Sequence, residues 1–112
     1  MKIENTKIQM RKGILEYCIL IILDEKESYA SEIIEALKDS KMIVVEGTVY
    51  PLLTRLKNAK LLQYKWEESK SGPPRKYYSL TVDGVVFLTE LKETWKDLKH
   101  AVESITKKSK TI

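Results

Sequence analysis

The sequence has few of the residues on which enzymes and metalloproteins depend. It contains one cysteine and one histidine among 112 residues, so an internal disulfide is impossible, and Cys18 and His100 alone cannot make a metal cluster. The glycines form no phosphate-binding loop. Glu67 and Glu68 are neighbours in an expected strand and point to opposite faces, which argues against a carboxylate pair. We therefore predict that the protein is not an enzyme and that it needs no cofactor.

Long apolar segments are missing as well. The apolar run Ile14–Leu23 spans about ten residues, whereas a transmembrane helix needs about 20. The polar N-terminus does not resemble a signal peptide. Cys18 lies within the apolar run and is expected to be a buried small hydrophobe. An unpaired cysteine is typical of a reducing compartment, so the sequence predicts a cytoplasmic protein with no membrane partner.

Charged residues are plentiful, and their distribution is uneven. Residues 41–80 carry eight Lys or Arg against three Glu, whereas residues 13–39 carry two Lys against seven acidic residues. Concentrated positive charge is typical of a surface that meets phosphates, although a solvated surface with chance clustering is the alternative. The chain is 43% hydrophobic and can bury one modest core, so dimerisation would help to stabilise it.

Hydrophobic periodicity predicts two helices in the first part of the chain. The first is expected over about residues 7–24. Its centre, Ile14–Leu23, is apolar nearly all round, which indicates burial on more than one side and favours contact with a second subunit. Ser28 is the predicted N-cap of the second helix. A linker over residues 39–45 leads to a third helix.

The third helix is expected to begin near Gly47. Its buried stripe is predicted from the helical spacing of Val49, Leu52, Leu53 and Leu56. Pro51 is tolerable because it is expected in the first turn, where its missing N–H has no helical partner. The outward residues are short polar, aromatic or basic, which suits phosphates and base edges: Thr48, Tyr50, Pro51, Thr54, Arg55, Lys57 and Asn58.

A β-hairpin is predicted next. Leu62, Tyr64 and Trp66 alternate with polar residues as in a strand. Ser69–Pro74 is the expected turn to a return strand, and Gly72 is available for a positive φ in that turn. A helix followed by a hairpin that carries basic residues is the order of a winged helix-turn-helix, in which the helix enters the major groove and the hairpin grips the backbone.

A fourth helix is expected to begin after Thr81, a favourable N-cap, with Asp83 in its first turn. Apolar residues then recur with the spacing of a coiled-coil seam: Leu88, Leu91, Trp95, Leu98, Val102 and Ile105. Packing on its own domain is one explanation. Because the rest of the chain already makes a complete small fold, we favour a homodimer seam. The fold class predicted is mainly α (α+β), with a winged helix-turn-helix domain at residues 1–81 and a dimerisation helix at residues 82–112.

These residues resemble the PadR family of bacterial transcriptional regulators, and within it the short-tailed subfamily. The resemblance covers nearly the whole chain and is carried by three segments: Gly47–Leu53 with Arg55 and Leu56, Gly72–Tyr78, and Leu80-Thr81 with Gly84. The chain departs from the family at Glu27–Ser31, where a Tyr-Gly pair is preferred, and at Lys57–Lys60, where an acid and a glycine are common. These departures leave the operator preference open.

The resemblance implies a ligand pore at the centre of a dimer. In short-tailed relatives a tryptophan of the fourth helix and its dimer mate stack on flat aromatic ligands, with phenolic acids and flat cationic drugs as family precedents. Trp95 matches that position, and plain core filling is its alternative role. The residues that map to the pore are Met10, Gly13, Tyr17, Leu88, Leu91, Trp95 and Lys99. Leu91 and Tyr17 are larger than the pore needs.

The predicted function is a ligand-responsive repressor that binds a palindromic operator as a homodimer. The predicted DNA contacts are Lys12, Tyr29, Thr48, Tyr50, Pro51, Thr54, Arg55, Arg75, Lys76 and Tyr77. The predicted dimer interface is Ile14, Cys18, Leu91, Trp95, Leu98, Val102 and Ile105. A winged-helix protein-interaction module and an architectural DNA binder without an effector are the alternatives.

Overall fold

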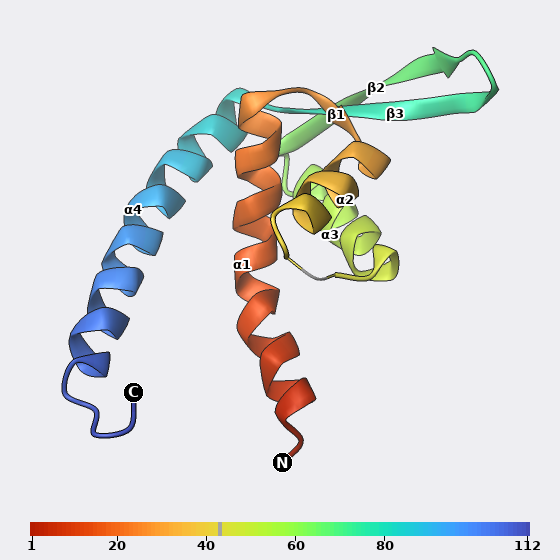
Figure 1. Ribbon diagram of the computed structural model, residues 1–112. Helices are drawn as coiled ribbons and strands as arrows, with labels where there is room; N and C mark the ends of the chain where they lie inside the picture. Colours follow the sequence, from red (N-terminus) through yellow and green to blue (C-terminus); the bar gives the residue numbers. More distant parts are fainter. Residues whose placement is uncertain (43) are drawn as a thin grey trace.

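The computed structural model describes residues 1–42 and 44–112. Its elements run in the order α1 (Ile3–Glu25), β1 (Ser28–Tyr29), α2 (Ala30–Asp39), α3 (Glu46–Asn58), β2 (Leu62–Ser69), β3 (Gly72–Leu80) and α4 (Val82–Thr106). The mainly helical fold with one small antiparallel sheet confirms the predicted fold class. Figure 1 shows a body made of α1, α2 and α3, a hairpin that extends from it, and α4 running down one side.

The core lies where the three helices of the body meet the base of the hairpin and the start of α4. Its buried side chains are Leu15, Ile19, Leu20, Leu23, Ile33, Ile34, Leu37, Val49, Leu53, Leu56, Leu62, Tyr78 and Leu88. Three of the four residues of the predicted α3 stripe are among them, and Leu52 packs half-buried at the edge. The periodicity argument for α3 is therefore confirmed.

The sheet has the strand order β1-β3-β2, and both pairings are antiparallel. Strands β2 and β3 form the wing, with Tyr64 opposite Tyr78 and Trp66 opposite Lys76. The turn at its tip is shorter than predicted, because only Lys70 and Ser71 lie outside the strands. None of the glycines has a positive φ, so the suggested use of Gly72 is wrong. The two strands of the wing extend well beyond the helical body (Figure 1).

The start of α2 also differs from the prediction. Ser28 is not its N-cap; it pairs with Tyr78 in β1, and its hydroxyl donates to the carbonyl of Lys26 at 2.9 Å. Tyr29 precedes the helix instead, and its backbone N–H donates to the Glu32 carboxylate at 3.0 Å. That bond is half of a capping box. The two-residue strand β1 was too short to show any periodicity in the sequence.

Helix α3 begins at Glu46, so Pro51 lies in its second turn rather than its first. The missing N–H of Pro51 leaves the carbonyl of Gly47 without its usual helical donor. Both residues are exposed, so water can take that place. The predicted linker at 39–45 includes Ile43, which lies outside the described residues.

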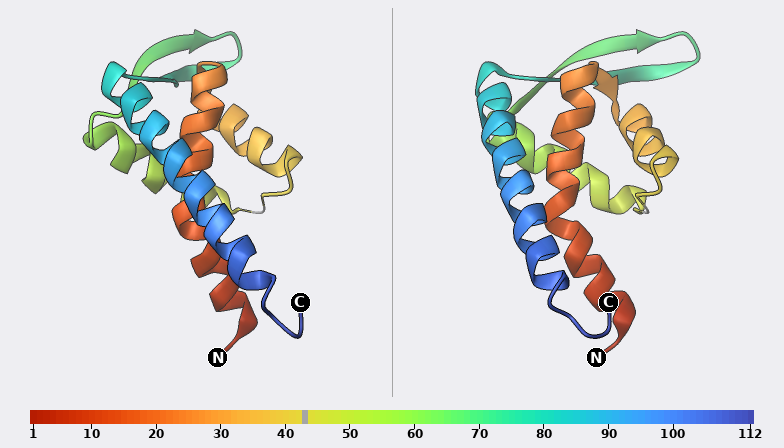
Figure 2. Two further views of the ribbon diagram at one scale, coloured as in Figure 1. Left: turned by 90° about the vertical axis from the view of Figure 1, so that its left-hand side faces the viewer. Right: turned by 60° about the vertical axis from the view of Figure 1, so that its left-hand side comes forward.

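Helix α4 begins as predicted. The hydroxyl of Thr81 accepts from the N–H of Gly84 at 2.9 Å, which satisfies one of the unpaired donors of the first turn. Helices α1 and α4 lie together at the hairpin end and separate toward the chain termini in Figure 1, and α4 crosses in front of α1 in the left view of Figure 2. Lys92 pairs with Asp24 at 3.8 Å between them. Helix α1 is longer than predicted at its N-terminal end, where its exposed first turns offered no apolar pattern to read.

Across residues 1–42 and 44–112, the structure contains no helix that combines the length and the apolar character needed to cross a membrane.

Candidate nucleic-acid interface

A cleft of about 390 Å³ lies between the start of α2, the exposed face of α3 and the wing. Its lining residues are Tyr29, Ala30, Ser31, Tyr50, Thr54, Trp66, Pro74, Arg75, Lys76 and Tyr78. Five of them are predicted DNA contacts, and they come from three segments that are distant in the sequence: Tyr29, Tyr50, Thr54, Arg75 and Lys76. The fold therefore places half of the predicted contact set on one concave surface.

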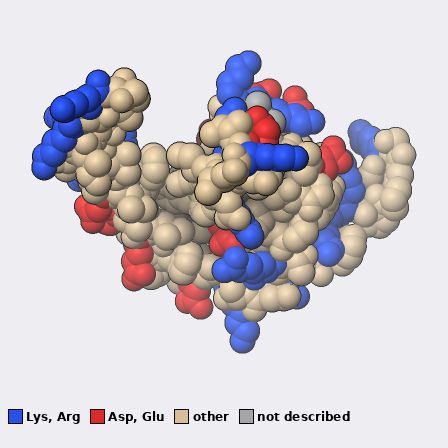
Figure 3. Space-filling model, turned by 90° about the horizontal axis from the view of Figure 1, so that it is seen from below, with Lys and Arg blue, Asp and Glu red and all other residues tan. Residues whose placement is uncertain are grey.

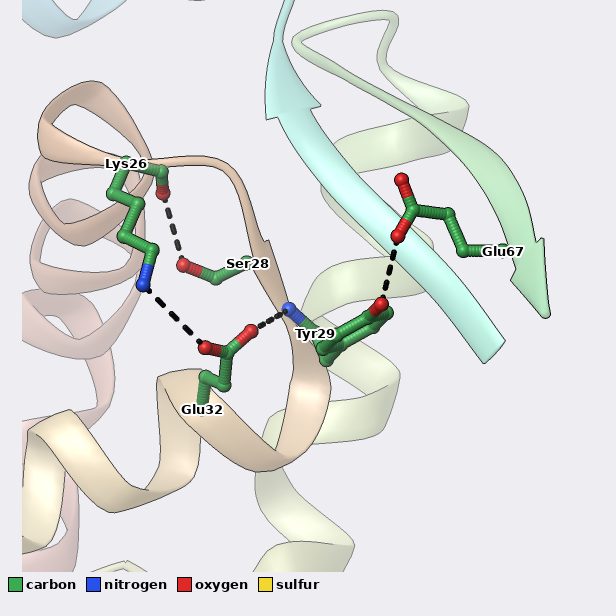
Figure 4. A network of polar contacts seen from close by, with 5 residues as sticks. All are labelled: Lys26, Ser28, Tyr29, Glu32 and Glu67. Atoms are coloured by element: carbon green, nitrogen blue, oxygen red, sulfur yellow. Dashed lines mark hydrogen bonds and ion pairs between the residues drawn. The ribbon is translucent and has the colours of Figure 1, made fainter. Parts of the chain in front are cut away.

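Tyr29 links α2 to the wing at the edge of this cleft, as Figure 4 shows. Its hydroxyl donates to Oε2 of Glu67 at 2.7 Å, and this hydrogen bond raises the pKa of the Tyr29 phenol. The guanidinium carbon of Arg75 lies 4.1 Å from the centre of the Tyr29 ring. The Tyr77 ring supports the same ring, with 4.8 Å between centroids. A hydroxyl, a cation and a carboxylate are thus held together at this edge of the cleft.

Lys76 lies between two aromatic rings on the face of the wing opposite Arg75 and Tyr77. Its Nζ lies 4.7 Å from the centre of the Tyr64 ring and 5.6 Å from that of Trp66. Lys57 of α3 reaches the same Tyr64 ring at 5.8 Å. Exposed cation–π contacts contribute about 0.5–1 kcal/mol each, enough to favour one direction for a flexible side chain. The aromatic residues therefore keep both charges between α3 and the wing.

The outward residues of α3 divide between two directions. Tyr50 and Thr54 face the cleft. Arg55 faces α1, where its Nη1 donates to Oε1 of Glu16 at 2.8 Å, although its side chain remains 74% exposed. Thr48 and Pro51 are exposed and do not line the cleft. The sequence could not show that Arg55 has an acidic partner 39 residues away.

Two further predicted contacts lie outside the cleft. Tyr77 is half-buried against the Tyr29 ring, and Nζ of Lys65 lies 5.5 Å from the centre of the Tyr77 ring. Tyr77 therefore supports the face of the wing that is opposite Lys76 and Trp66. Lys12 is exposed on α1. The structure does not bring either residue to the cleft.

Trp66, Ser31 and Pro74 line the cleft and were not among the predicted contacts. The indole of Trp66 is 61% exposed, which is unusual for so large an apolar group. Its register opposite Lys76 places both side chains on the face of the wing that turns toward α3. The strand alternation placed Trp66 on the wing, but only the pairing with β3 shows which residues share its face.

A second hollow, of about 340 Å³, lies between α1 and α4. Seen from below in Figure 3, the molecule is hollowed between the α4 end at the left and the body, and few charged side chains lie there. It gathers five of the seven predicted ligand residues: Met10, Gly13, Tyr17, Leu91 and Trp95. The ring centroids of Tyr17 and Trp95 are 6.5 Å apart. Lys99 is exposed outside the hollow, and Leu88 is only 2% exposed, because it belongs to the core.

Four of the seven predicted dimer residues, Trp95, Leu98, Val102 and Ile105, form an exposed apolar stripe along α4. Exposure rises along the helix from 40% at Trp95 to 54% at Leu98, 59% at Val102 and 71% at Ile105. Leu91 is half-buried beside them, as are Ile14 and Cys18 on α1, where burial raises the pKa of the Cys18 thiol. Phe87, 40% exposed, lies four residues before Leu91 and eight before Trp95 and extends the stripe. The seam spacing was counted from Leu88, and Phe87 was therefore missed.

The family model of the PadR-like transcriptional regulators matches residues 19–90, a span that holds α2, α3, the wing and the start of α4. The chain belongs to the PadR-like transcriptional regulator family. Members of this family regulate transcription and are not enzymes.

Solved structures of PadR-like proteins agree with this assignment. A PadR-like transcription factor from Bacteroides fragilis is 59% identical, with a TM-score of 0.77 over 90% of this chain and 98% of that one. A PadR-like regulator from Bacillus cereus is 37% identical, with a TM-score of 0.78 over 90% of this chain and 99% of that one. An uncharacterized protein of Lysinibacillus sphaericus is 27% identical over 82% of this chain and 87% of its own length.

In the part of the chain that the structure describes, no three His, Cys, Asp or Glu side chains come together as a metal site. The cleft instead offers hydroxyls, cations and exposed aromatic rings, which are the groups that proteins present to nucleic-acid backbones and base edges.

Proposed function

We propose that this PadR-like regulator is a cytoplasmic repressor that binds a palindromic DNA operator as a homodimer. The observation that carries the proposal is the cleft in which Tyr50 and Thr54 of α3 face Arg75 and Lys76 of the wing. In a winged helix-turn-helix, the recognition helix enters the major groove and the wing contacts the adjacent backbone. On this basis α3 supplies base selectivity, with Thr48 and Pro51 exposed in its first two turns, and the wing supplies phosphate affinity.

The exposed stripe on α4 supports a homodimer. Residues 82–112 would then form the dimerisation helix of a short-tailed member, although the first turns of α4 also pack on the winged core through Leu88. A two-fold dimer presents two copies of α3, and palindromic half-sites match that symmetry when they lie about 34 Å apart.

The hollow between α1 and α4 is the proposed site of a flat aromatic effector. In the homodimer, Trp95 and its copy would offer two indole faces at the centre, where stacking and the exclusion of water act together. A ligand there would shift the two crossing helices and change the spacing of the two α3 helices. If it prefers the mismatched spacing, it lowers operator affinity by linkage. The bulk of Tyr17 and Leu91 limits the size of such a ligand.

The function is tested by gel shift with the DNA upstream of the chain's own gene, in competition with random DNA. We expect the Lys76→Ala variant to bind both DNAs more weakly and to reduce the salt slope by about one, because one phosphate contact is lost whatever the sequence. Lys96→Ala, which removes an exposed charge from α4, is the control and should bind like the wild type.

Three other outcomes would contradict the assignment. A change in sequence preference with an unchanged salt slope would mean that Lys76 reads bases. Equal affinity of the wild type for upstream and random DNA would indicate an architectural binder. Absence of binding to either DNA would favour a protein-interaction module.

The effector proposal predicts quenching of Trp95 fluorescence. The two tryptophans lie at different sites, Trp66 in the cleft and Trp95 in the hollow, so Trp66→Phe isolates the Trp95 signal. We expect planar dyes or phenolic acids to quench this signal at micromolar concentrations through stacking. Cyclohexanecarboxylic acid, which is charged but not planar, is the control. If the planar compounds leave the emission unchanged, the protein has no effector site at Trp95.

A further inference from the structure

We propose that Glu67 is an internal competitor for DNA phosphate. Its carboxylate accepts the hydroxyl proton of Tyr29 that a backbone phosphate would otherwise accept, and it thereby limits the affinity of the protein for DNA. This inference rests on the proposed DNA-binding function and assigns a determinant of affinity within the same interface.

In the structure, the Tyr29 hydroxyl already donates to an anionic oxygen, that of the Glu67 carboxylate. The Tyr29 hydroxyl has one proton, and that proton is directed to Oε2 of Glu67 at 2.7 Å. The other carboxylate oxygen lies 3.6 Å from Nζ of Lys65. A carboxylate and a phosphate both present anionic oxygens to hydroxyl and cationic donors. DNA that engages Tyr29 must therefore displace Glu67 first.

The charges around Glu67 strengthen the competition. Glu67 lies opposite Arg75 in the β2–β3 register, on the same face as Lys65. The Arg75 guanidinium is itself stacked on the Tyr29 ring. One carboxylate thus offsets part of the positive charge of the wing at the place where a phosphate would bind. The Glu67 side chain is 35% exposed, so an incoming anion meets it directly.

The position of the wing does not depend on this hydrogen bond. Strand β1 pairs with β3 through Ser28 opposite Tyr78 and Tyr29 opposite Tyr77. The rings of Tyr29 and Tyr77 are also in contact. These interactions hold α2 and the wing together when Tyr29 exchanges one acceptor for another. Glu67 can therefore be displaced without movement of the surface that it occupies.

Glu68 provides a matched control. It is exposed, it precedes the same turn, and it makes no hydrogen bond or ion pair within the described part of the chain. Glu67→Ala and Glu68→Ala remove the same charge, so the difference between them reports the acceptor rather than the net charge. We expect Glu67→Ala to bind a random-sequence duplex about five- to tenfold more tightly than Glu68→Ala does, which is the size of effect of one hydrogen bond of ordinary strength.

Two further readouts separate competition from other roles. The salt slopes of the two variants should be equal, because the released hydroxyl is neutral and displaces no counterion. In a Tyr29→Phe background, which lacks the hydroxyl, Glu67→Ala and Glu68→Ala should bind alike. Glu67→Gln, which keeps the size and a weaker acceptor, should have an affinity between those of the wild type and Glu67→Ala.

The results that overturn the inference are distinct from failure of the DNA-binding function. Equal affinities of Glu67→Ala and Glu68→Ala, or a difference that persists without the Tyr29 hydroxyl, would show that Glu67 acts only through its charge. Weaker binding by Glu67→Ala and by Glu67→Gln would make Glu67 a support of the wing instead. Absence of DNA binding by the wild type would remove the proposed function itself.

Discussion

The Gly84→Ala variant is expected to lose about 3 kcal/mol or more of unfolding free energy, a fall of more than about 10 °C in melting temperature for a domain of this size. A Cβ at this position would lie 2.1 Å from the carbonyl oxygen of Leu61 and 3.1 Å from its carbonyl carbon. Because both atoms belong to the backbone, no side-chain rotation can relieve the overlap.

The overlap falls at the point where the wing returns to the body. The carbonyl of Leu61 accepts from the backbone N–H of Thr81 at 3.1 Å, and the hydroxyl of Thr81 donates to the carbonyl of Lys60 at 2.7 Å. The same hydroxyl accepts from the N–H of Gly84. The start of β2 and the start of α4 are therefore tied together through Thr81, and displacement of Leu61 would loosen the wing, the core and α4 at once.

Gly47→Ala is the matched control for this prediction. Gly47 is also helical, but no heavy atom lies within 4 Å of the position that its Cβ would take. Alanine favours a helix over glycine by about 1 kcal/mol, so Gly47→Ala should melt at the wild-type temperature or slightly above it. Thermal unfolding followed by circular dichroism measures both variants. Equal melting temperatures for the two would mean that the Leu61 backbone can move aside at little cost.

The sequence predicted the features that periodicity and capping chemistry decide. The α3 stripe is visible because Val49, Leu53 and Leu56 recur with the period of a helix that is buried on one side. Thr81 is recognisable because a hydroxyl before a helix has a specific partner in the first turn. A heptad pattern gives the spacing of apolar residues but not what covers them. For this reason the sequence did not show that Leu88, the first residue of the seam, lies in the core.

What the sequence could not predict depends on contacts between distant residues. The pairing of Arg55 with Glu16 and that of Tyr29 with Glu67 join segments that are 39 and 38 residues apart. Neither pairing leaves a local pattern. Lys60 is a different case: it has a φ of 65°, in the left-handed region that favours glycine after a helix. The family commonly has a glycine within the segment that corresponds to Lys57–Lys60. In this chain Lys60 therefore adopts a backbone conformation that glycine would adopt more easily.

Leu98→Asp is expected to convert the proposed homodimer into a monomer. The Leu98 side chain is 54% exposed in the single chain and lies at the middle of the α4 stripe, where the partner helix would cover it. An unpaired carboxylate buried there would cost about 4 kcal/mol, which raises the dissociation constant of the dimer about a thousandfold. Sedimentation velocity should show the monomer, and operator binding should weaken more than binding to random DNA, because a monomer reads one half-site.

Val86→Asp tests whether dimerisation depends on the face of α4 that receives the new charge or only on the charge itself. Val86 is 55% exposed, close to the value for Leu98, and lies on α4 about 120° around the helix axis from it, by the 3.6-residue repeat. The two variants add the same charge to the same helix at similarly exposed aliphatic positions. If the stripe is the interface, Val86→Asp remains a dimer while Leu98→Asp does not. A dimer in both variants would exclude the stripe, and with it the slot between Trp95 and its copy, since the effector site requires the partner that the stripe recruits.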